Sequence, residues 1–231
     1  MIIPAHNEEA SIGKVIDEIR SSKPGVDILV VDDASDDNTA RVAREMQVDV
    51  ASLSINLGIG GAAQTGFQVA KQLGYDIAIQ IDGDGQHDPS CIDEIITPVL
   101  KNETDITIGS RNLQNGNAKP SITRGIGIRF FSWLTTRVTS RPITDCSSGF
   151  RALNRRALDL FAESYPVDFP DAEALIMAHR AGLRVSEVPA RFRERHNGRS
   201  SLRPWRMLYY PLKETLSIGI MMTKRGGCPS E

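Results

Sequence analysis

Short apolar runs alternate with amphipathic segments along most of the chain. Strands buried on both faces of a sheet read as continuous apolar runs, whereas helices repeat apolar residues every three or four positions. The apolar runs that predict strands are residues 1–3, 27–32, 49–53, 75–82, 105–109 and 184–188. The periodic segments that predict helices are residues 10–21, 39–47, 62–73, 89–100 and 172–181. This alternation predicts an α/β fold, doubly wound around a mostly parallel sheet.

The pattern changes after Arg111. Residues 112–120 are polar and turn-rich, as in a loop, and residues 122–138 form a basic, aromatic and amphipathic stretch. We expect residues 148–151 to lead directly into a helix. The tail is aromatic and apolar on a broken helical period between residues 202 and 222. We therefore expect a single domain over residues 1–202, split after residue 110 into two halves, and a C-terminal helical appendage, an amphipathic tail, over residues 203–231.

Charge divides the chain at the same point. Residues 1–110 hold 7 Lys+Arg against 19 Asp+Glu, a net charge of −12, and residues 111–231 hold 20 Lys+Arg against 10 Asp+Glu, a net charge of +10. Of those 20 basic residues, 17 are arginines, which grip phosphate through a planar fork of donors. The asymmetry indicates either an ordinary solvated surface or an acidic metal-binding half that faces a basic phosphate-binding half. No nucleic-acid motif accompanies the arginines, so we expect no nucleic-acid partner.

Cysteine usage and hydropathy restrict the compartment. The three cysteines, Cys91, Cys146 and Cys228, form no CxxC pair, which argues against a zinc site or a disulfide framework and favours a reducing compartment. No secretory signal opens the sequence, and no apolar run approaches the roughly 18 residues that span a bilayer. We expect a cytoplasmic protein that contacts a membrane at most peripherally, at its cytoplasmic face.

The strongest chemical signal is Asp82-Gly83-Asp84-Gly85-Gln86-His87, at the end of a predicted buried strand. Ligands of open α/β sheets bind at the carboxyl ends of the strands. Two carboxylates one residue apart repel each other, by on the order of 4 kcal/mol at a separation of about 4 Å and an effective dielectric of about 20. A divalent cation removes this repulsion and bridges to a diphosphate. The motif therefore predicts Mg²⁺ or Mn²⁺ as a cofactor, the alternative being an acidic turn.

Two known sequence motifs, the EF-hand calcium loop and the dinucleotide-binding fingerprint, partly match segments of this chain. An EF-hand calcium loop requires Gly and Glu where this motif has His87 and Asp93, which excludes that site. Residues 58–63 read GIGGAA, similar to the GxGxxA fingerprint of dinucleotide-binding enzymes. The segment before it is a poor strand, so an NAD-binding dehydrogenase stays a minor alternative.

Six motifs follow one another along the chain. They are Pro4-Ala5-His6-Asn7-Glu8, Asp32-Asp33, Asn56-x-Gly58-x-Gly60-Gly61, the acidic motif at residues 82–87, Gly109-Ser110-Arg111, and Asp145-x-x-Ser148-Gly149-Phe150-Arg151. The ordered set resembles the inverting glycosyltransferases of family 2, in the branch similar to dolichol-phosphate mannosyltransferases and bacterial polyprenyl-phosphate sugar transferases. The resemblance covers nearly the whole chain up to Leu202. It implies a GT-A-like, nucleotide-sugar-binding sheet and the inverting transfer of a hexose from a UDP- or GDP-sugar.

The same resemblance implies roles for individual residues, with residues 1–110 as the nucleotide-sugar and metal half and residues 111–202 as the acceptor half. The residues expected at the nucleotide are Pro4, His6, Glu8, Val31, Asp33, Asp82, Gly83, Gln86 and Arg195. The residues expected at the metal are Asp82, Asp84 and Gln86, and those expected at the acceptor are Arg111, Arg124 and Ser200. The sequence departs from the family's pattern at His6, where Tyr is common, at Gly83, where Ala is common, and at Ser201, where Lys is frequent.

Two classes of acceptor remain open. A polyprenyl or dolichyl phosphate is already anionic and needs arginines rather than a general base. A sugar hydroxyl, as in cell-surface polysaccharide synthesis, needs a carboxylate to take its proton. The candidates for a part in catalysis are Asp84, through its bound ion, and Asp145, Asp171 and Glu173, of which Asp171 is equally well an N-cap. Residues 122–138 predict contact with a membrane surface, or packing against the sheet or in a homodimer interface.

Overall fold

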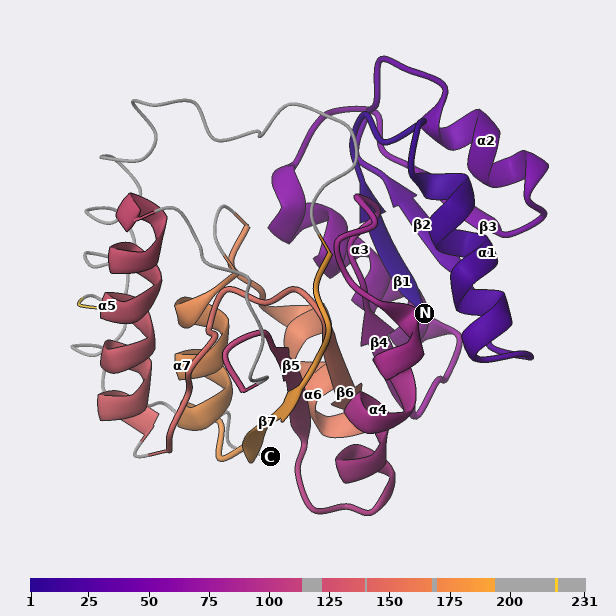
Figure 1. Ribbon diagram of the computed structural model, residues 1–231. Coiled ribbons are helices and arrows are strands. Elements are labelled where there is room, and N and C mark those ends of the chain that lie inside the picture. Colours follow the sequence, from indigo (N-terminus) through magenta and orange to yellow (C-terminus); the bar gives the residue numbers. More distant parts are fainter. Residues whose placement is uncertain (114–121, 140, 168–169, 194–218, 220–231) are drawn as a thin grey trace.

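The computed structural model describes residues 1–113, 122–139, 141–167, 170–193 and 219, with residues 122–130 described by their backbone alone. Within these residues, seven strands form one sheet in the order β3-β2-β1-β4-β6-β5-β7 (Figure 1). The strands are β1 (Ile2–Ala5), β2 (Leu29–Asp32), β3 (Asp49–Ser52), β4 (Ile77–Gln80), β5 (Ile106–Ser110), β6 (Arg151–Asn154) and β7 (Val185–Pro189). Every pairing is parallel except those of β6. The doubly wound, mostly parallel sheet is confirmed.

Helices cover both faces of this sheet because neighbouring strand residues point to opposite sides. Ile2 and Val31 belong to one apolar cluster, and their neighbours Ile3 and Val30 belong to the other. The first cluster is closed by α3 (Gly58–Gln72), α5 (Ile122–Thr139), α6 (Arg155–Glu163) and α7 (Ala172–Arg180). The second cluster is covered by α1 (Ile12–Ser22), α2 (Thr39–Glu45) and α4 (Ile92–Leu100). The short 3₁₀ helix η1 (Pro89–Cys91) directly precedes α4.

The strand β6 corrects the sequence prediction, which had residues 148–151 leading straight into a helix. β6 runs antiparallel to β4 on one side and to β5 on the other, and α6 begins only after it. The strand has four residues and opens with a buried arginine, Arg151, so it gives no apolar run to recognise. Because it is reversed, the loop before β6 lies at the sheet edge where the other strands end.

The glycines of the GIGGAA segment have a packing role in this fold. The segment opens α3 after the edge strand β3, whereas the dinucleotide fingerprint belongs to the first strand-to-helix turn of its sheet. A Cβ on Gly60 would lie 2.1 Å from the carbonyl oxygen of Pro166, and a Cβ on Gly66 would lie 2.3 Å from Cγ2 of Ile2. The glycines therefore let α3 approach β1 and the segment around Pro166.

The amphipathic stretch predicted at residues 122–138 forms α5, an 18-residue helix. Its inner side is tied to the loop before β6, because Ser132 Oγ donates to the carbonyl oxygen of Thr144 and Thr136 Oγ1 donates to that of Ile143. In the described ranges no helix combines the length and the apolar character needed to cross a bilayer. The predicted tail, residues 203–231, lies outside the described residues apart from Gly219.

Replacing Gly60 with alanine should destabilise the fold. The added Cβ would meet the backbone of the Pro166–Val167 segment, which cannot rotate away, so we expect a loss of about 1–3 kcal/mol in the free energy of unfolding. Gly13→Ala on α1 is the matched control, because its new Cβ would be 3.4 Å from Val42 Cγ1, near ordinary contact. Urea denaturation measures both variants, and equal stabilities would contradict this account of α3.

Candidate active site

The predicted motifs meet at one edge of the sheet. β1, β2, β4, β5 and β7 all end there, and β6 begins there. The residues just beyond these strand ends are His6, Asp33, the acidic loop 82–87, Arg111, the loop 145–149 and Phe192. The edge therefore has an acidic side after β4 and an arginine-bearing side after β5.

The predicted nucleoside side contains both buried and exposed residues. Pro4 and Val31 are paired neighbours in β1 and β2, and both are buried. The exposed His6 lies with Nδ1 2.8 Å from the carbonyl oxygen of Asp33, so the ring is held against the end of β2. Glu8 accepts a hydrogen bond from Ser11 Oγ, which also donates to the carbonyl oxygen of Gly83 in the acidic loop.

Asp33 has a structural role that the sequence did not reveal. Its Oδ1 accepts from the backbone N–H of Leu57 at 2.7 Å and its Oδ2 accepts from that of Gly58 at 2.9 Å. A carboxylate at these first amides satisfies donors that an α-helix leaves unpaired and complements the helix dipole. Asp33 thus fixes the start of α3, and its predicted contact with the nucleotide stays a prediction.

The acidic loop turns back over the strand ends. Asp84 Oδ1 accepts from the backbone N–H of Gln86, and Gly85 has φ +75°, a conformation that glycine adopts without strain. Asp82 lies directly over Gly149 from the loop before β6, since a Cβ on Gly149 would be 2.6 Å from Asp82 Oδ1. The absent side chain of Gly149 therefore makes room for this carboxylate.

His87 supports the acidic loop from beneath. It is fully buried, stacks on Phe150 with ring centroids 5.3 Å apart, and meets Phe192 edge-on at 5.0 Å. Its Nδ1 accepts the backbone N–H of Asp82, so a neutral ring carries its proton on Nε2, which lies 3.7 Å from Asp82 Oδ2. Burial lowers the pKa of His87 to about 4, so near neutral pH this contact is not an ion pair.

The donor set of the acidic loop fits a hard divalent cation. Mg²⁺ is commonly held by one or two carboxylates together with substrate phosphate oxygens and water, and Asp82 and Asp84 supply two carboxylates, each partly exposed. Within the described residues, no group of three or more His, Cys, Asp or Glu side chains is close enough to enclose an ion. Water and substrate phosphate oxygens commonly supply the other ligands of a Mg²⁺ ion held by two carboxylates.

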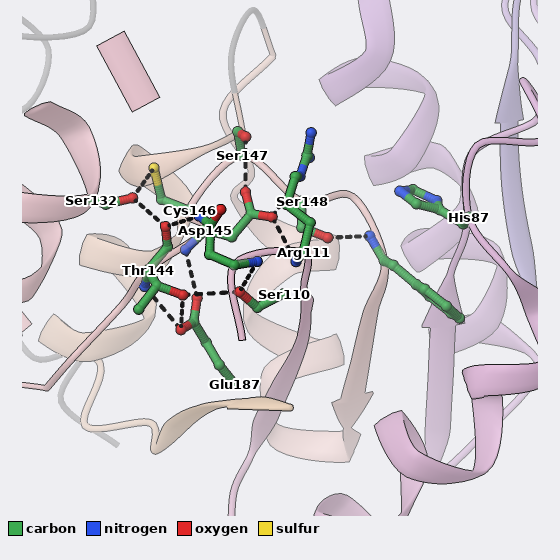
Figure 2. Close-up of polar contacts among 12 residues, drawn as sticks. His87, Ser110, Arg111, Ser132, Thr144, Asp145, Cys146, Ser147, Ser148 and Glu187 are labelled. Atoms are coloured by element: carbon green, nitrogen blue, oxygen red, sulfur yellow. Dashed lines mark hydrogen bonds and ion pairs between the residues drawn. The ribbon is translucent and has the colours of Figure 1, made fainter. Parts of the chain in front are cut away.

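Arg111 is fixed on the other side of the edge (Figure 2). Asp145 Oδ2 accepts from both the backbone N–H of Arg111, at 3.1 Å, and its Nε, at 2.7 Å. The Arg111 guanidinium carbon also lies 4.6 Å from the ring centroid of Phe192. Asp145 is completely buried, and its Oδ1 accepts from Ser147 Oγ. Both oxygens of this predicted catalytic carboxylate are therefore used inside the protein.

The remaining candidate carboxylates, Asp171 and Glu173, lie at the start of α7. Asp171 occupies the N-cap position but makes no side-chain capping hydrogen bond, so the predicted capping role is not observed. Burial raises the pKa of Asp171; nearby Arg151 opposes this, and the charges of Asp145 and Asp82 add to it. Glu173 follows in the first turn of the helix, partly buried.

Sequence reasoning gave no role to Arg151, which organises the arginine-bearing side. The residue is 2% exposed, and its guanidinium donates to the carbonyl oxygens of Cys146, Ser148 and Pro170 and to the hydroxyl of Tyr165. A buried arginine with these four acceptors joins the loop before β6 to the segment before α7. Its sequence signal is its place as the last residue of the motif at residues 145–151.

Three predicted site residues have no described side chain. Arg124 is on α5, where only the backbone is described, and Arg195 and Ser200 lie outside the described residues.

Comparison with known proteins decides the family. Residues 1–161, more than half of the chain, match the model of the family described as Glycosyl transferase family 2. This chain belongs to glycosyl transferase family 2. The family match covers residues 58–63, so the alternative prediction of an NAD-binding dehydrogenase is wrong.

The family 2 chain has relatives that match over most of its length. It is 32% identical over 210 residues to the UDP-N-acetylglucosamine–dolichyl-phosphate N-acetylglucosaminyltransferase of Methanococcus voltae, covering 82% of this chain and 83% of that protein. It is 34% identical over 211 residues to the undecaprenyl-phosphate mannosyltransferase of Micrococcus luteus, covering 87% and 86%.

Solved structures share the fold. Glucosyl-3-phosphoglycerate synthase of Mycobacterium tuberculosis, in complex with Mn²⁺, UDP and its product, aligns with a TM-score of 0.69 at 20% identity, covering 94% of this chain and 77% of that one. Mannosyl-3-phosphoglycerate synthase of Rubrobacter xylanophilus gives a TM-score of 0.70 at 19% identity, covering 100% and 76%. At these identities the likeness establishes the GT-A-like fold.

Replacing Gly149 with alanine should impair the acidic loop while leaving the fold in place. The new Cβ would displace the Asp82 carboxylate. In wild type, UDP or GDP with Mn²⁺, at about 100 times the dissociation constant, should add about 2.7 kcal/mol to the stability. We expect Gly149→Ala and Asp82→Asn to lose most of that thermal shift.

The melting temperature of each variant without nucleotide is the control, because it separates lost binding from lost folding. A Gly149→Ala protein that retains the full nucleotide- and Mn²⁺-dependent shift would contradict the role given to this glycine.

Proposed function

We propose that this chain transfers a sugar, with inversion, from a UDP- or GDP-sugar to a polyprenyl phosphate, in a reaction that depends on a divalent cation. The observation that carries the proposal is the fixed guanidinium of Arg111, on the same sheet edge as the Asp82–Asp84 pair. Among the described residues, its side-chain hydrogen bond runs from Nε to Asp145, so its terminal nitrogens are left for an anion. Relatives named for transfer to dolichyl and undecaprenyl phosphate support this acceptor class.

The chemistry is a single displacement. An oxygen of the acceptor phosphate forms a bond to C1 of the sugar, the bond from C1 to the donor's β-phosphate oxygen breaks, and the nucleoside diphosphate leaves with that electron pair. The acceptor is already anionic, so orientation by Arg111 serves in place of a strong base. A cation held by Asp82 and Asp84, with Gln86 beside them, would stabilise negative charge on the departing diphosphate.

The donor would lie along the acidic side of the edge. We assign the nucleoside to the strand ends that carry Pro4, His6, Glu8, Val31 and Asp33, and the diphosphate to Asp82, Gly83 and Gln86. The resemblance to the family adds Arg195 at the diphosphate, and Arg124 and Ser200 at the acceptor, as proposals that rest on sequence alone.

A hydroxyl acceptor is the second candidate, and Asp171 is the observation that favours it. Burial raises the pKa of Asp171, against the opposing charge of Arg151 and with the added charges of Asp145 and Asp82, and a carboxylate with a raised pKa is a better proton acceptor. Asp145 is a poorer candidate base, because its oxygens accept from Arg111 and Ser147. Under the polyprenyl-phosphate proposal, Asp171→Asn should leave most of the turnover intact.

A membrane surface is the setting that this acceptor requires, and we propose peripheral contact through the outer side of α5. Trp133, 60% exposed, lines a hollow of about 330 Å³ together with Thr136, Arg137, Arg141 and Pro142. An exposed tryptophan beside two arginines suits anionic lipid headgroups. The predicted homodimer and the cytoplasmic location are also proposals, the latter resting on the cysteine usage.

Replacing Arg111 with alanine should raise the KM for a polyprenyl phosphate by about tenfold to a hundredfold, the effect of losing one charge-assisted contact. The thermal shift given by UDP or GDP with Mn²⁺ should stay within error of wild type. Arg155→Ala is the matched control, because Arg155 begins α6 at the opposite edge of the sheet and pairs with Asp159. An unchanged acceptor KM in Arg111→Ala would refute the proposed acceptor site.

Liposome flotation tests the membrane contact. Wild type should float with vesicles rich in anionic phospholipid at low salt and be released at high salt, since each basic residue near such a surface contributes about 1 kcal/mol. Trp133→Ala combined with Arg137→Ala should reduce flotation, and Trp133→Ala alone should reduce it less. Equal flotation of wild type and the double variant would show that this side of α5 is not the contact.

A further inference from the structure

Glu187 lies outside every predicted motif, yet it accepts hydrogen bonds from the loop that precedes β6. It projects from β7 toward Thr144 and Asp145 (Figure 2). Its Oε2 accepts from the backbone N–H and the hydroxyl of Thr144, both at 2.9 Å, and its Oε1 accepts from the backbone N–H of Asp145 at 2.8 Å. Both carboxylate oxygens therefore accept hydrogen bonds from two successive residues of one loop.

The hydrogen bonds continue from this loop to Arg111. The Asp145 backbone is held by Glu187, and the Asp145 carboxylate holds the main-chain N–H and the Nε of Arg111. A second link joins the same two segments, because the hydroxyls of Ser110 and Thr144 lie 2.9 Å apart. The orientation of the guanidinium is thus connected through Asp145 to a carboxylate on a neighbouring strand.

β7 and the chain just after it support Arg111 at two points. Glu187 pairs in register with Ile108 of β5, three residues before Arg111. Beyond the end of β7, Phe192 lies under the Arg111 guanidinium at 4.6 Å. β7 therefore supplies the carboxylate that binds the Asp145 loop, and the segment after β7 supplies the aromatic face beneath the arginine.

We propose that Glu187 is a positioning residue for Arg111, which fixes the guanidinium for an acceptor phosphate by holding Asp145 in place. The proposal rests on the acceptor role of Arg111 proposed above. Glu187 itself does not reach the acceptor in this account. Burial raises the pKa of Glu187, and the hydrogen bonds donated by Thr144 and Asp145 oppose that shift.

Glu187→Gln is the direct test, because glutamine has the same shape but only one acceptor oxygen. Its amide NH₂ would face either the Thr144 donors or the Asp145 N–H, and donor against donor would push the loop away. Glu163→Gln is the matched control, since Glu163 lies exposed on α6 and pairs with Lys71. If the Gln variant does not fold, Glu187→Asp replaces it, because the shorter side chain keeps the charge and withdraws the carboxylate.

The first readout needs no ligand. Solvent exchange of the Arg111 Nε–H, followed by NMR and assigned with Arg111→Lys, reports the hydrogen bond to Asp145. Glu187→Gln should accelerate this exchange about tenfold, the equivalent of about 1.4 kcal/mol, and Glu163→Gln should not change it. Thr144→Ala should have a smaller effect, because both backbone N–H contacts with Glu187 remain. Unchanged exchange in Glu187→Gln overturns the proposal.

The second readout is binding of geranyl phosphate to the full chain, saturated with UDP or GDP and Mn²⁺. Glu187→Gln should weaken this binding about tenfold, with nucleotide affinity unchanged, and should have no further effect in an Arg111→Ala background. If Glu187→Gln still weakens geranyl phosphate binding about tenfold in the Arg111→Ala background, Glu187 acts independently of Arg111 and the proposal is overturned. If Arg111→Ala itself binds geranyl phosphate normally, the acceptor site is wrong, while the exchange measurement still decides whether Glu187 positions Arg111.

Discussion

The antiparallel pairing of β6 with both β4 and β5 brings the loop before it to the edge where the other strands end. In an all-parallel sheet, that loop would lie at the opposite edge, far from the acidic residues that follow β4. Reversal puts Gly149 under Asp82 and puts Asp145 against Arg111. The two halves of the site therefore exist as a unit because one four-residue strand runs against its neighbours.

Four aspartates and two arginines set the charge at this edge of the sheet. Asp82, Asp84, Asp145 and Asp171 stand within one site, and the buried Arg151 and the fixed Arg111 oppose part of their charge. Phe192 links the two sides, because its ring contacts both His87 under the acidic loop and the Arg111 guanidinium. In the proposed reaction a cation, the donor diphosphate and the acceptor phosphate would complete this arrangement, with the cation at the aspartates and the acceptor phosphate at the arginine.

Local patterns predicted much of the fold and part of the site. The buried run that ends in Asp82 identified β4 and its acidic loop, because a strand end followed by paired carboxylates is readable within a few residues. The pattern missed β6, which is short and opens with Arg151, and it could not separate the adjacent Asp32 and Asp33, of which Asp33 caps α3. The pairing of Arg111 with Asp145 spans 34 residues and depends on the strand order, which no local spacing reveals.

The most direct measurement is the structure of the lipid product. The purified chain would be incubated with a nucleotide sugar, Mn²⁺ and a polyprenyl phosphate, and the product analysed by NMR at the anomeric carbon. The account predicts a sugar joined through C1 to the lipid phosphate, with the configuration at C1 opposite to that of the donor. Retention of configuration, or release of free sugar at a rate that the lipid phosphate does not change, would contradict it.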